Sequence, residues 1–253
     1  MSALAADISR ALDPCILAAD AGFPDLDPWQ ARLLRERPRR SLLCCCRQSG
    51  KSTITALIAL YVALYEAPAL ILLVSPAQRQ SAELFRVVML AYQKLTDVPA
   101  LTMESVLRAE FANGSRIIAL PGSEKTTRGY AKADLVVIDE AARVDDLLLS
   151  ALRPMMAVSK GGGRLIALST PAGRRGWFFE AWTSGGETWD RTRVPASECP
   201  RISEEFLTEE LKELGAQRFA EEYSLEFIDA DAAVFPSAII DAAFTDAVVP
   251  LWQ

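Results

Sequence analysis

The sequence predicts an α/β protein with a mainly parallel sheet flanked by helices and a small helical lid. Apolar runs of strand length alternate with longer amphipathic stretches along most of the chain, as in successive strand–helix–strand units. A loop that contains Gly50, Lys51 and Ser52 lies between the first apolar run and the first long helical stretch. After Pro195 the apolar runs give way to acidic helical segments. Crossover helices of such units cover both faces of the sheet, and the acidic segments would form the lid.

The individual strands and helices are predicted from the spacing of apolar residues. Short continuous apolar runs indicate buried strands, and apolar residues three or four positions apart, such as Ile54, Leu57 and Ile58, indicate a helix. Asn113-Gly114 interrupts an alternating stretch and is the strongest short hairpin signal. In chain order we expect a strand at Ser41–Cys46, a helix at Ser52–Tyr65, a strand at Ala69–Val74, a helix at Ala77–Leu95, a hairpin within Arg108–Leu120, a strand at Leu135–Ile138, a helix at Asp145–Met156 and a strand at Arg164–Leu168.

The pattern divides the chain into an N-terminal helical segment, a core, the lid and a tail. The lid is predicted to contain two acidic helices, Ser203–Leu214 and Ala216–Glu226. The tail is weakly patterned and rich in alanine and aspartate. The four segments span residues 1–26, 27–198, 199–228 and 229–253.

Composition excludes several classes of site. The 253 residues include no histidine, which removes Ser-His-Asp and Cys-His nucleophile systems and every histidine-based metal site. The adjacent Cys44, Cys45 and Cys46 would alternate across a strand, which does not suit a clustered metal site. The net charge of −6 argues against wholesale coating of nucleic acid, although a local basic stripe could still contact it. No apolar run reaches about 18 residues, so we expect a soluble, intracellular protein with reduced thiols.

The stretch "LLCCCRQSGKST" has most of the phosphate-binding pattern G-x-x-x-x-G-K-[ST]. In that pattern backbone amides wrap the β-phosphate, the lysine bridges the β- and γ-phosphates, and the hydroxyl holds Mg²⁺. Cys45 stands at the first glycine, which limits the tight turn there, but the amides and the start of the helix are intact. We therefore expect ATP to be bound by Gln48, Ser49, Gly50, Lys51, Ser52 and Thr53, with Mg²⁺ on Ser52.

A second motif, "ADLVVIDEAARV", delivers two carboxylates at the end of a buried strand. Parallel sheets bind ligands at the carboxyl ends of their strands. Asp139 would hold Mg²⁺ through water, and Glu140 would polarise the attacking water as general base. The alternative for this motif alone is an acidic surface turn after a core strand. The two motifs together favour an ATPase.

Three stretches together, "CRQSGKS", "VVIDEAA" and "LIALSTPAGRRGWFFEAW", resemble the ATPase domain of viral large terminase subunits, the motors that package DNA into tailed-phage heads. The resemblance covers roughly Asp27 to Phe227. It implies a RecA/ASCE-type P-loop NTPase core that uses ATP and Mg²⁺ to translocate double-stranded DNA into a procapsid. It also implies a homo-oligomeric ring on the portal protein, a small terminase subunit as partner, and a location in the cytoplasm of the infected bacterial host.

The same resemblance assigns roles to single residues. Arg47 is the arginine of the phosphate loop, and Lys51 and Glu140 act with it in catalysis. Ser169 and Thr170, followed by a proline, match the coupling motif that senses the γ-phosphate, and for Thr170 the alternative is a plain hydrogen bond at a strand end.

Two further assignments rest on looser matches. Trp29 and Gln30 resemble the Q motif with which related motors read adenine, although Trp29 taken alone is more typical of a core position. Arg128 lies twelve residues before Glu140, a spacing near that of an arginine that serves the adjacent subunit in ring motors. Its alternative is a loop arginine that stays solvated or pairs with Glu124.

Several questions stay open at the level of sequence. The arginines of two basic clusters could contact DNA or another subunit, or could simply be solvated. About 25 residues after Asp229 are too few for the nuclease domain that large terminases carry, so we expect an isolated motor, either truncated or split.

The rival functions are a helicase-like DNA-dependent ATPase and a nucleotide-dependent scaffold with weak turnover. We also expect glycine at Cys45 and Cys46 to be tolerated, unless these cysteines belong to the packed core of the strand. The basic clusters are Arg35, Arg37, Arg39 and Arg40, and Arg174 and Arg175.

Overall fold

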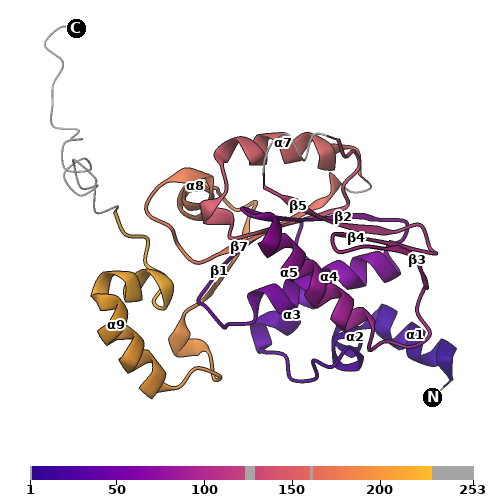
Figure 1. The fold of residues 1–253 in the computed structure, drawn as a ribbon, viewed down its shortest axis with the longest axis horizontal. Helices are drawn as coiled ribbons and strands as arrows, with labels where there is room; N and C mark the ends of the chain where they lie inside the picture. Colours follow the sequence, from indigo (N-terminus) through magenta and orange to yellow (C-terminus); the bar gives the residue numbers. More distant parts are fainter. Residues whose placement is uncertain (1, 123–128, 160–161, 230–253) are drawn as a thin grey trace, which may run out of the picture.

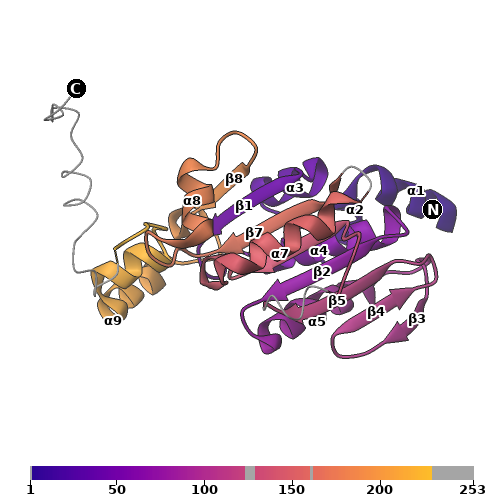
Figure 2. The same cartoon turned by 90° about the horizontal axis from the view of Figure 1, so that it is seen from above.

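One eight-stranded sheet forms the middle layer of the molecule, with the strand order β3-β4-β5-β2-β6-β7-β1-β8. The computed structural model describes residues 2–122, 129–159 and 162–229 (Figures 1 and 2). The strands from β5 to β8 in that order run parallel, whereas β3 and β4 are antiparallel at one edge. The strands are β1 (Arg40–Cys45), β2 (Leu70–Ser75), β3 (Leu101–Glu104), β4 (Arg108–Phe111), β5 (Arg116–Pro121), β6 (Leu135–Asp139), β7 (Arg164–Ser169) and β8 (Asp190–Val194).

The sheet confirms the predicted α/β class with mainly parallel strands. The strands predicted from continuous apolar runs are present with ends that differ by at most one residue, and their side chains are buried because helices cover both faces. The hairpin is also confirmed: β4 and β5 pair in antiparallel fashion around Asn113 and Gly114. Gly114 has a φ of 86°, which a glycine adopts without steric cost.

The helices form layers on the two faces of the sheet. The helices α1 to α5 lie on one face, and α7 and α8 lie on the other (Figure 1). Among the described residues, no helix is long and apolar enough to cross a bilayer. The helices are α1 (Ala3–Leu12), α2 (Pro14–Asp20), α3 (Pro28–Glu36), α4 (Lys51–Tyr65), α5 (Gln78–Tyr92), α7 (Asp146–Ala157), α8 (Gly176–Ser184) and α9 (Glu204–Glu222), with short 3₁₀ turns at Ala141–Arg143 and Ala196–Glu198.

Helix α4 is buried on almost every side. From Lys51 to Leu64, only Ser52 and Thr53 are not buried. The sheet covers one side of α4, and α2, α3 and α5 cover the others. This explains why its sequence is apolar all round rather than along one stripe. The N-terminal helices are fixed to it by polar contacts as well, since the Tyr61 hydroxyl donates to the carbonyl of Ala11 at 2.7 Å.

The lid is built on α9, which lies to one side of the sheet (Figure 1). The Ser203 hydroxyl caps the helix by accepting from the amide of Phe206 at 3.2 Å. Gly215 interrupts α9 with φ 75° and ψ 163°, at the position where the sequence predicts one helix to end and another to begin. The second part ends at Glu222 rather than at the predicted Glu226.

Four elements were not predicted from the sequence: α3, β3, α8 and β8. The signal for α3 is a capping box in which Gln30 Oε1 accepts from the backbone amide of Asp27 at 2.9 Å, followed by Pro28 in the first turn. The strands β3 and β8 lie at the two edges of the sheet and are partly exposed. Apolar and polar residues alternate in β3 and polar residues dominate β8, so neither forms a continuous apolar run.

Candidate active site

The predicted motifs meet at the carboxyl ends of three neighbouring strands. In the sheet, β7 lies between β6, which ends at Asp139, and β1, which leads into the phosphate loop. Asp139 is in register with Leu168 on one side of β7, and Ser169 is in register with Cys44 on the other. The end of β7, where Thr170 follows, therefore lies between the carboxylates and the phosphate loop.

The phosphate loop is held in shape by its own hydrogen bonds. The Ser49 hydroxyl donates to the carbonyl of Cys46 at 2.9 Å. Gln48 and Gly50 both have positive φ, 61° and 83°. The φ of Gly50 favours glycine at this position, and a Cβ there would also lie 2.6 Å from Nε2 of Gln30.

Helix α4 begins directly after this loop and has no side-chain cap at its start. The first amides of an uncapped helix point outward and carry the positive end of its dipole, which favours an anion. Lys51, the first helical residue, is 8% exposed, and Ser52 and Thr53 are half-buried. These residues form a short, rigid, electropositive cradle.

The adjacent cysteines belong to the core, not to the loop. Cys44 and Cys45 are the last residues of β1, and the amide of Cys46 donates to the carbonyl of Val194 at 3.0 Å. All three side chains are fully buried, and burial raises the pKa of the Cys44 and Cys46 thiols to about 12. The sulfur of Cys46 lies 3.5 Å from that of Cys199. The structure supports the alternative that these cysteines belong to the packed core, and on that ground we expect glycine not to be tolerated here.

Asp139 is a buried carboxylate. It is 9% exposed, and Oδ1 accepts from the backbone amide of Glu140 at 3.0 Å. Burial raises its pKa to about 6, the neighbouring Glu140 adds to that rise, and the ammonium of Lys51 opposes it. No side-chain cation of the described residues forms an ion pair with Asp139. A buried carboxylate with so few ligands suits a cation that arrives with the nucleotide.

Glu140 adopts a left-handed backbone conformation, with a φ of 51°, immediately after β6. Such a conformation is uncommon for a non-glycine residue and concentrates at functional sites. Its carboxylate accepts from Nη1 of Arg143 at 2.9 Å. The same Nη1 lies 3.1 Å from the Thr170 hydroxyl, so Arg143 joins the residue after β6 to the residue after β7.

The lid reaches the site through Glu222 at the end of α9. Glu222 accepts from Nε of Arg47 at 2.9 Å and from Nη2 of Arg143 at 3.4 Å. Glu222 is mostly buried, with a side chain 15% exposed, whereas the side chain of Arg47 is 64% exposed. The predicted arginine of the phosphate loop thus rests on the lid in this structure.

A second connection joins the lid to the phosphate loop. Arg201 donates to both oxygens of Asp27, at 2.9 and 2.6 Å, and to the carbonyl of Ser49 at 3.0 Å. The guanidinium holds the pKa of Asp27 below its usual range. Gln30 touches the same carbonyl, since Nε2 donates to Ser49 O at 3.4 Å. Its amide therefore contacts the loop and the α3 cap, and its predicted role in reading adenine stays a prediction.

Sequence reasoning missed three of the side chains that build this site: Arg143, Arg201 and Glu222. Arg143 is close to the carboxylate motif in sequence, and its proximity to Glu140 could have marked it. Arg201 and Glu222 lie in the lid, and their contacts with the phosphate loop carry no local signal. Ser169 lies where predicted and is fully buried, with a hydroxyl that has no hydrogen-bond partner among the described residues. Arg128 lies outside the described residues.

The chain matches a protein-family model and resembles several solved structures. The family model "Terminase large subunit, T4likevirus-type, N-terminal" matches residues 43–241. The ATPase domain of the large terminase of Thermus phage P74-26 is similar in structure, with a TM-score of 0.69 and 20% identity over 83% of this chain and 97% of that one. No curated protein matches the chain.

Two solved large terminases share the fold. One, from a thermophilic bacteriophage and in complex with ATP-γ-S, has a TM-score of 0.66 and 10% identity, over 80% of this chain and 53% of that one. The other, from bacteriophage HK97, has a TM-score of 0.64 and 20% identity, over 79% and 50%. The chain spans about half the length of these two proteins, and at such identities the likeness establishes the RecA-like fold.

Proposed function

The chain belongs to the terminase large subunit family and matches the N-terminal part of its T4-like type, and on this premise we propose that it is an ATP-hydrolysing motor that packages double-stranded viral DNA into a procapsid. One observation carries the proposal. Lys51 and the uncapped start of α4 face the buried Asp139 and the strained Glu140 at one edge of the sheet. An electropositive cradle beside two carboxylates is the arrangement that phosphoryl transfer requires.

The phosphate loop would bind the triphosphate of ATP. Its amides and the start of α4 would wrap the β-phosphate, and the Lys51 ammonium would reach the β- and γ-phosphates. Complexes of the thermophilic phage's large terminase with ADP and with ATP-γ-S support nucleotide binding as the task of this fold. Gln30 donates to the carbonyl of Ser49 in the loop and is the candidate to read the adenine.

Mg²⁺ fits the residues that the site offers. The buried Asp139 carboxylate has no cationic partner among the described residues, and the Ser52 hydroxyl lies on the first turn of α4. These two groups would hold the ion, Asp139 through water. When bound, Mg²⁺ neutralises charge on the β- and γ-phosphate oxygens.

Glu140 would act as the general base. Its carboxylate accepts a proton from water while the water oxygen bonds to the γ-phosphorus and the bond from that phosphorus to the β,γ-bridging oxygen breaks, which releases ADP. Arg143 donates to one oxygen of Glu140, and no described residue donates to the other, which could accept from water. Arg143 also holds Thr170, so the position of the base and the coupling motif are linked.

Coupling to DNA movement would run through the lid. Glu222 binds Arg47 and Arg143 together, so a shift of Arg47 toward the γ-phosphate would remove one of the two guanidinium groups that hold the end of α9. We further propose that the motor acts as a ring on the portal protein, with the small terminase subunit as partner, in the cytoplasm of the infected bacterium.

Hydrolysis of ATP by the purified chain, with and without duplex DNA, tests the proposal. Lys51→Ala should abolish nucleotide binding or hydrolysis, because the γ-phosphate loses its main protein counterion. Glu140→Gln should leave ATP bound and slow its hydrolysis by about 10²- to 10⁴-fold, because the amide keeps the shape but cannot accept a proton. Undiminished hydrolysis in Lys51→Ala would overturn the phosphate-loop assignment. ATP binding without measurable hydrolysis in the wild-type ring would favour the scaffold, and strand separation would favour the helicase-like alternative.

A further inference from the structure

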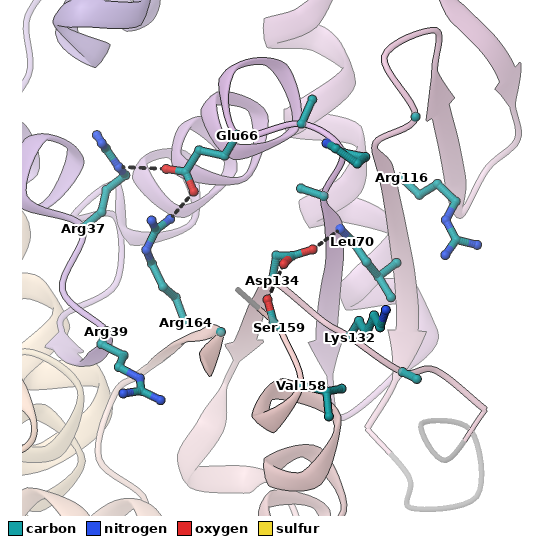
Figure 3. Close-up of a pocket in the computed structure, with 16 residues that line it drawn as sticks. Arg37, Arg39, Glu66, Leu70, Arg116, Lys132, Asp134, Val158, Ser159 and Arg164 are labelled. Carbon is teal, nitrogen blue, oxygen red and sulfur yellow. Dashed lines mark hydrogen bonds and ion pairs between the residues drawn. The ribbon is translucent and has the colours of Figure 1, made fainter. Parts of the chain in front are cut away.

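A second concave site lies at the amino ends of the parallel strands, whereas the candidate active site lies at their carboxyl ends. It is a cavity of about 670 Å³ lined by residues at or next to the beginnings of β1, β2, β5, β6 and β7 (Figure 3). Because these strands are parallel, their beginnings lie at one edge and the phosphate loop and carboxylates at the other. A strand of five residues spans roughly 17 Å, so the cavity cannot share a ligand atom with the active site.

The cavity is basic in a protein that is acidic overall. Of the described residues that line it, five are basic and two are acidic, a formal excess of three positive charges, whereas the whole chain carries −6. Glu66 lies between Arg37 and Arg164, at 3.4 and 2.8 Å, and neutralises only one of them (Figure 3). Asp134 is occupied by the backbone amide of Leu70 and by a short hydrogen bond from a serine hydroxyl.

Three cations remain without a carboxylate partner among the described residues: Arg39, Arg116 and Lys132. Arg39 makes a single long hydrogen bond, 3.4 Å, to the carbonyl of Gly162. Arg116 and Lys132 make no side-chain hydrogen bond or ion pair with any described residue. They come from three different segments of the chain and line one cavity, with Arg39 at one end of the view and Arg116 and Lys132 at the other (Figure 3). Their sequence neighbours are well fixed, because Arg116 begins β5 and Lys132 precedes the buried start of β6.

The walls of the cavity are preformed. Asp134 ties the turn before β6 to the start of β2, where its Oδ2 accepts from the Leu70 amide at 2.8 Å. Gly163 packs so closely that a Cβ there would lie 2.7 Å from the carbonyl of Ala133. Binding an anion here would therefore require ordering of side chains but no rearrangement of the backbone.

We propose that this cavity binds phosphate groups of the backbone of duplex DNA. The proposal rests on the proposed function, since it supplies the motor with a grip on its substrate. Guanidinium and ammonium groups are the usual ligands of phosphodiesters, and a basic concavity in an acidic protein concentrates the attraction at one place. None of the described residues that line the cavity is aromatic, so these residues offer no aromatic ring on which a base could stack. Contacts to phosphates alone carry no sequence information, which suits a motor that must pass DNA of any sequence.

The structure shows that most arginines of the first basic cluster, Arg35 to Arg40, already have partners within the protein. Arg35 is paired with Asp13 at 2.9 Å, and Arg37 with Glu66. Arg40 stacks at 5.9 Å over the ring of Trp189. Of these four arginines, Arg39 alone is exposed and without a carboxylate or aromatic partner among the described residues. The DNA contact is thus inferred from a cavity that adds Arg116 and Lys132 to Arg39, not from the cluster as a whole.

Binding of fluorescently labelled duplexes of two unrelated sequences to the 253-residue chain tests the proposal, with anisotropy measured over a series of salt concentrations. Arg116→Gln combined with Lys132→Gln should weaken binding of both duplexes about tenfold at low salt, and should lower the slope of log affinity against log salt by about 2. The matched control, Arg79→Gln combined with Lys212→Gln, removes the same charges from exposed positions outside the cavity and should change binding little. Thermal unfolding and DNA-independent ATP hydrolysis should match wild type in both variants.

Each alternative gives a different result. Equal weakening in both double variants would show a general charge effect and overturn the proposal, as would unchanged binding in the cavity variant or no duplex binding by the wild-type chain. If the cavity variant lost binding of inorganic pyrophosphate but kept duplex binding, the ligand would be a free phosphate anion and not DNA. If the cavity variant failed to fold, Arg39→Gln, which alters an exposed side chain, would decide by the same measurements. Failure of the ATPase proposal would appear separately, as absent hydrolysis in a chain that still binds DNA through this cavity.

Discussion

Arg143 is the residue at which the site and the lid meet. One guanidinium donates to Glu140, Thr170 and Glu222, at 2.9, 3.1 and 3.4 Å. A planar guanidinium can serve several acceptors in fixed directions, which the single ammonium of a lysine cannot do. Arg143 is therefore a positioning residue: it holds the proposed base and the coupling motif and does not itself contact the reacting atoms.

We predict that Arg143→Lys and Arg143→Ala lower kcat for ATP hydrolysis by about tenfold or more, with little change in KM. The reason is that each loses charge-assisted hydrogen bonds that orient Glu140, worth about 1.5–3 kcal/mol, while the phosphate cradle stays intact. Steady-state kinetics measure both constants, with Arg153→Ala on the exposed face of α7 as control. A large rise in KM at constant kcat would place Arg143 on the nucleotide instead.

Asp139 should make the nucleotide-free protein less stable as the pH rises. Its pKa is about 6 in the folded chain, above its ordinary value of 3.8, so the folded state binds the extra proton. The stabilising contribution is complete below about pH 4 and is lost as the pH rises through about 6, and linkage puts its full size at up to about 3 kcal/mol.

Urea unfolding between pH 4 and pH 8 checks this prediction for wild type and Asp139→Asn. The variant should be more stable than wild type at pH 8, and the difference should shrink toward pH 4. Glu187→Gln, an exposed change, serves as control. A constant difference across this range would mean that Asp139 does not titrate there.

At the scale of elements, β1 shows why a cysteine run can replace glycine ahead of a phosphate loop. The strand continues to Cys45, and the loop that turns the chain is confined to Arg47–Gly50. We predict that Cys45→Gly with Cys46→Gly lowers the free energy of unfolding by on the order of 3 kcal/mol, because it removes buried side chains and adds two flexible residues to the end of a central strand.

Chemical denaturation in reducing buffer measures this effect, with Cys15→Ala as control at a half-buried helical position. Stability within about 0.5 kcal/mol of wild type, the range typical of surface changes, would show that the strand ends before Cys45. The fully buried thiols make that outcome incompatible with the structure.

Elements with a strong local sequence pattern could be predicted from the sequence. Edge strands, and short helices that depend on distant contacts, could not. The buried parallel strands read as apolar runs because helices cover both sides, and the hairpin has its Asn-Gly turn. The edge strand β8, "DRTRV", is half-exposed, and its polar residues gave no such signal. Helix α8 is short and aromatic, and its place depends on contacts of Phe178 and Trp182 with the distant Phe227.

The candidate site divides in the same way. Lys51, Asp139, Glu140 and Ser169 lie in contiguous motifs, and the order of β6, β7 and β1 brings these motifs to one edge. Contacts between residues far apart in sequence, such as Arg47 with Glu222, depend on where the lid packs. No pattern within a short window contains that information, so such contacts become visible only in the structure.

For the whole molecule, two sets of contacts connect the lid to the candidate nucleotide site, so nucleotide binding could change the position of the lid. Arg47 and Arg143 both rest on Glu222, and Arg201 joins the segment before α9 to the phosphate loop through the Ser49 carbonyl. The lid thus touches both the loop that would bind phosphate and the residue that holds the base. A nucleotide that changes either contact would change the other, which is the physical requirement for coupling hydrolysis to movement.

In the assembled ring, Arg128 is a candidate to act on the nucleotide of the neighbouring subunit, and the alternative is a loop arginine that stays solvated or pairs with Glu124. Phosphoryl transfer builds charge on the γ-oxygens, and a guanidinium supplied in trans can speed it by about 10³- to 10⁵-fold. Arg128→Ala should therefore bind ATP normally and hydrolyse it slowly. A ring mixed from Arg128→Ala and Glu140→Gln subunits should regain activity where an intact Arg128 of one subunit faces an intact Glu140 of the next.

ATP hydrolysis by rings assembled with portal and DNA measures this rescue, with each variant alone and Arg153→Ala mixed with Glu140→Gln as controls. Since every subunit of a pure variant ring lacks the same group, neither variant alone can form a complete site, and mixing alone creates one. Mixed rings that are no more active than the average of the two pure rings, with assembly confirmed by size, would show that Arg128 does not act across the interface. In that case the charge on the γ-phosphate would have to be met from within one subunit, where Arg47, once freed from Glu222, is the exposed guanidinium of the phosphate loop itself.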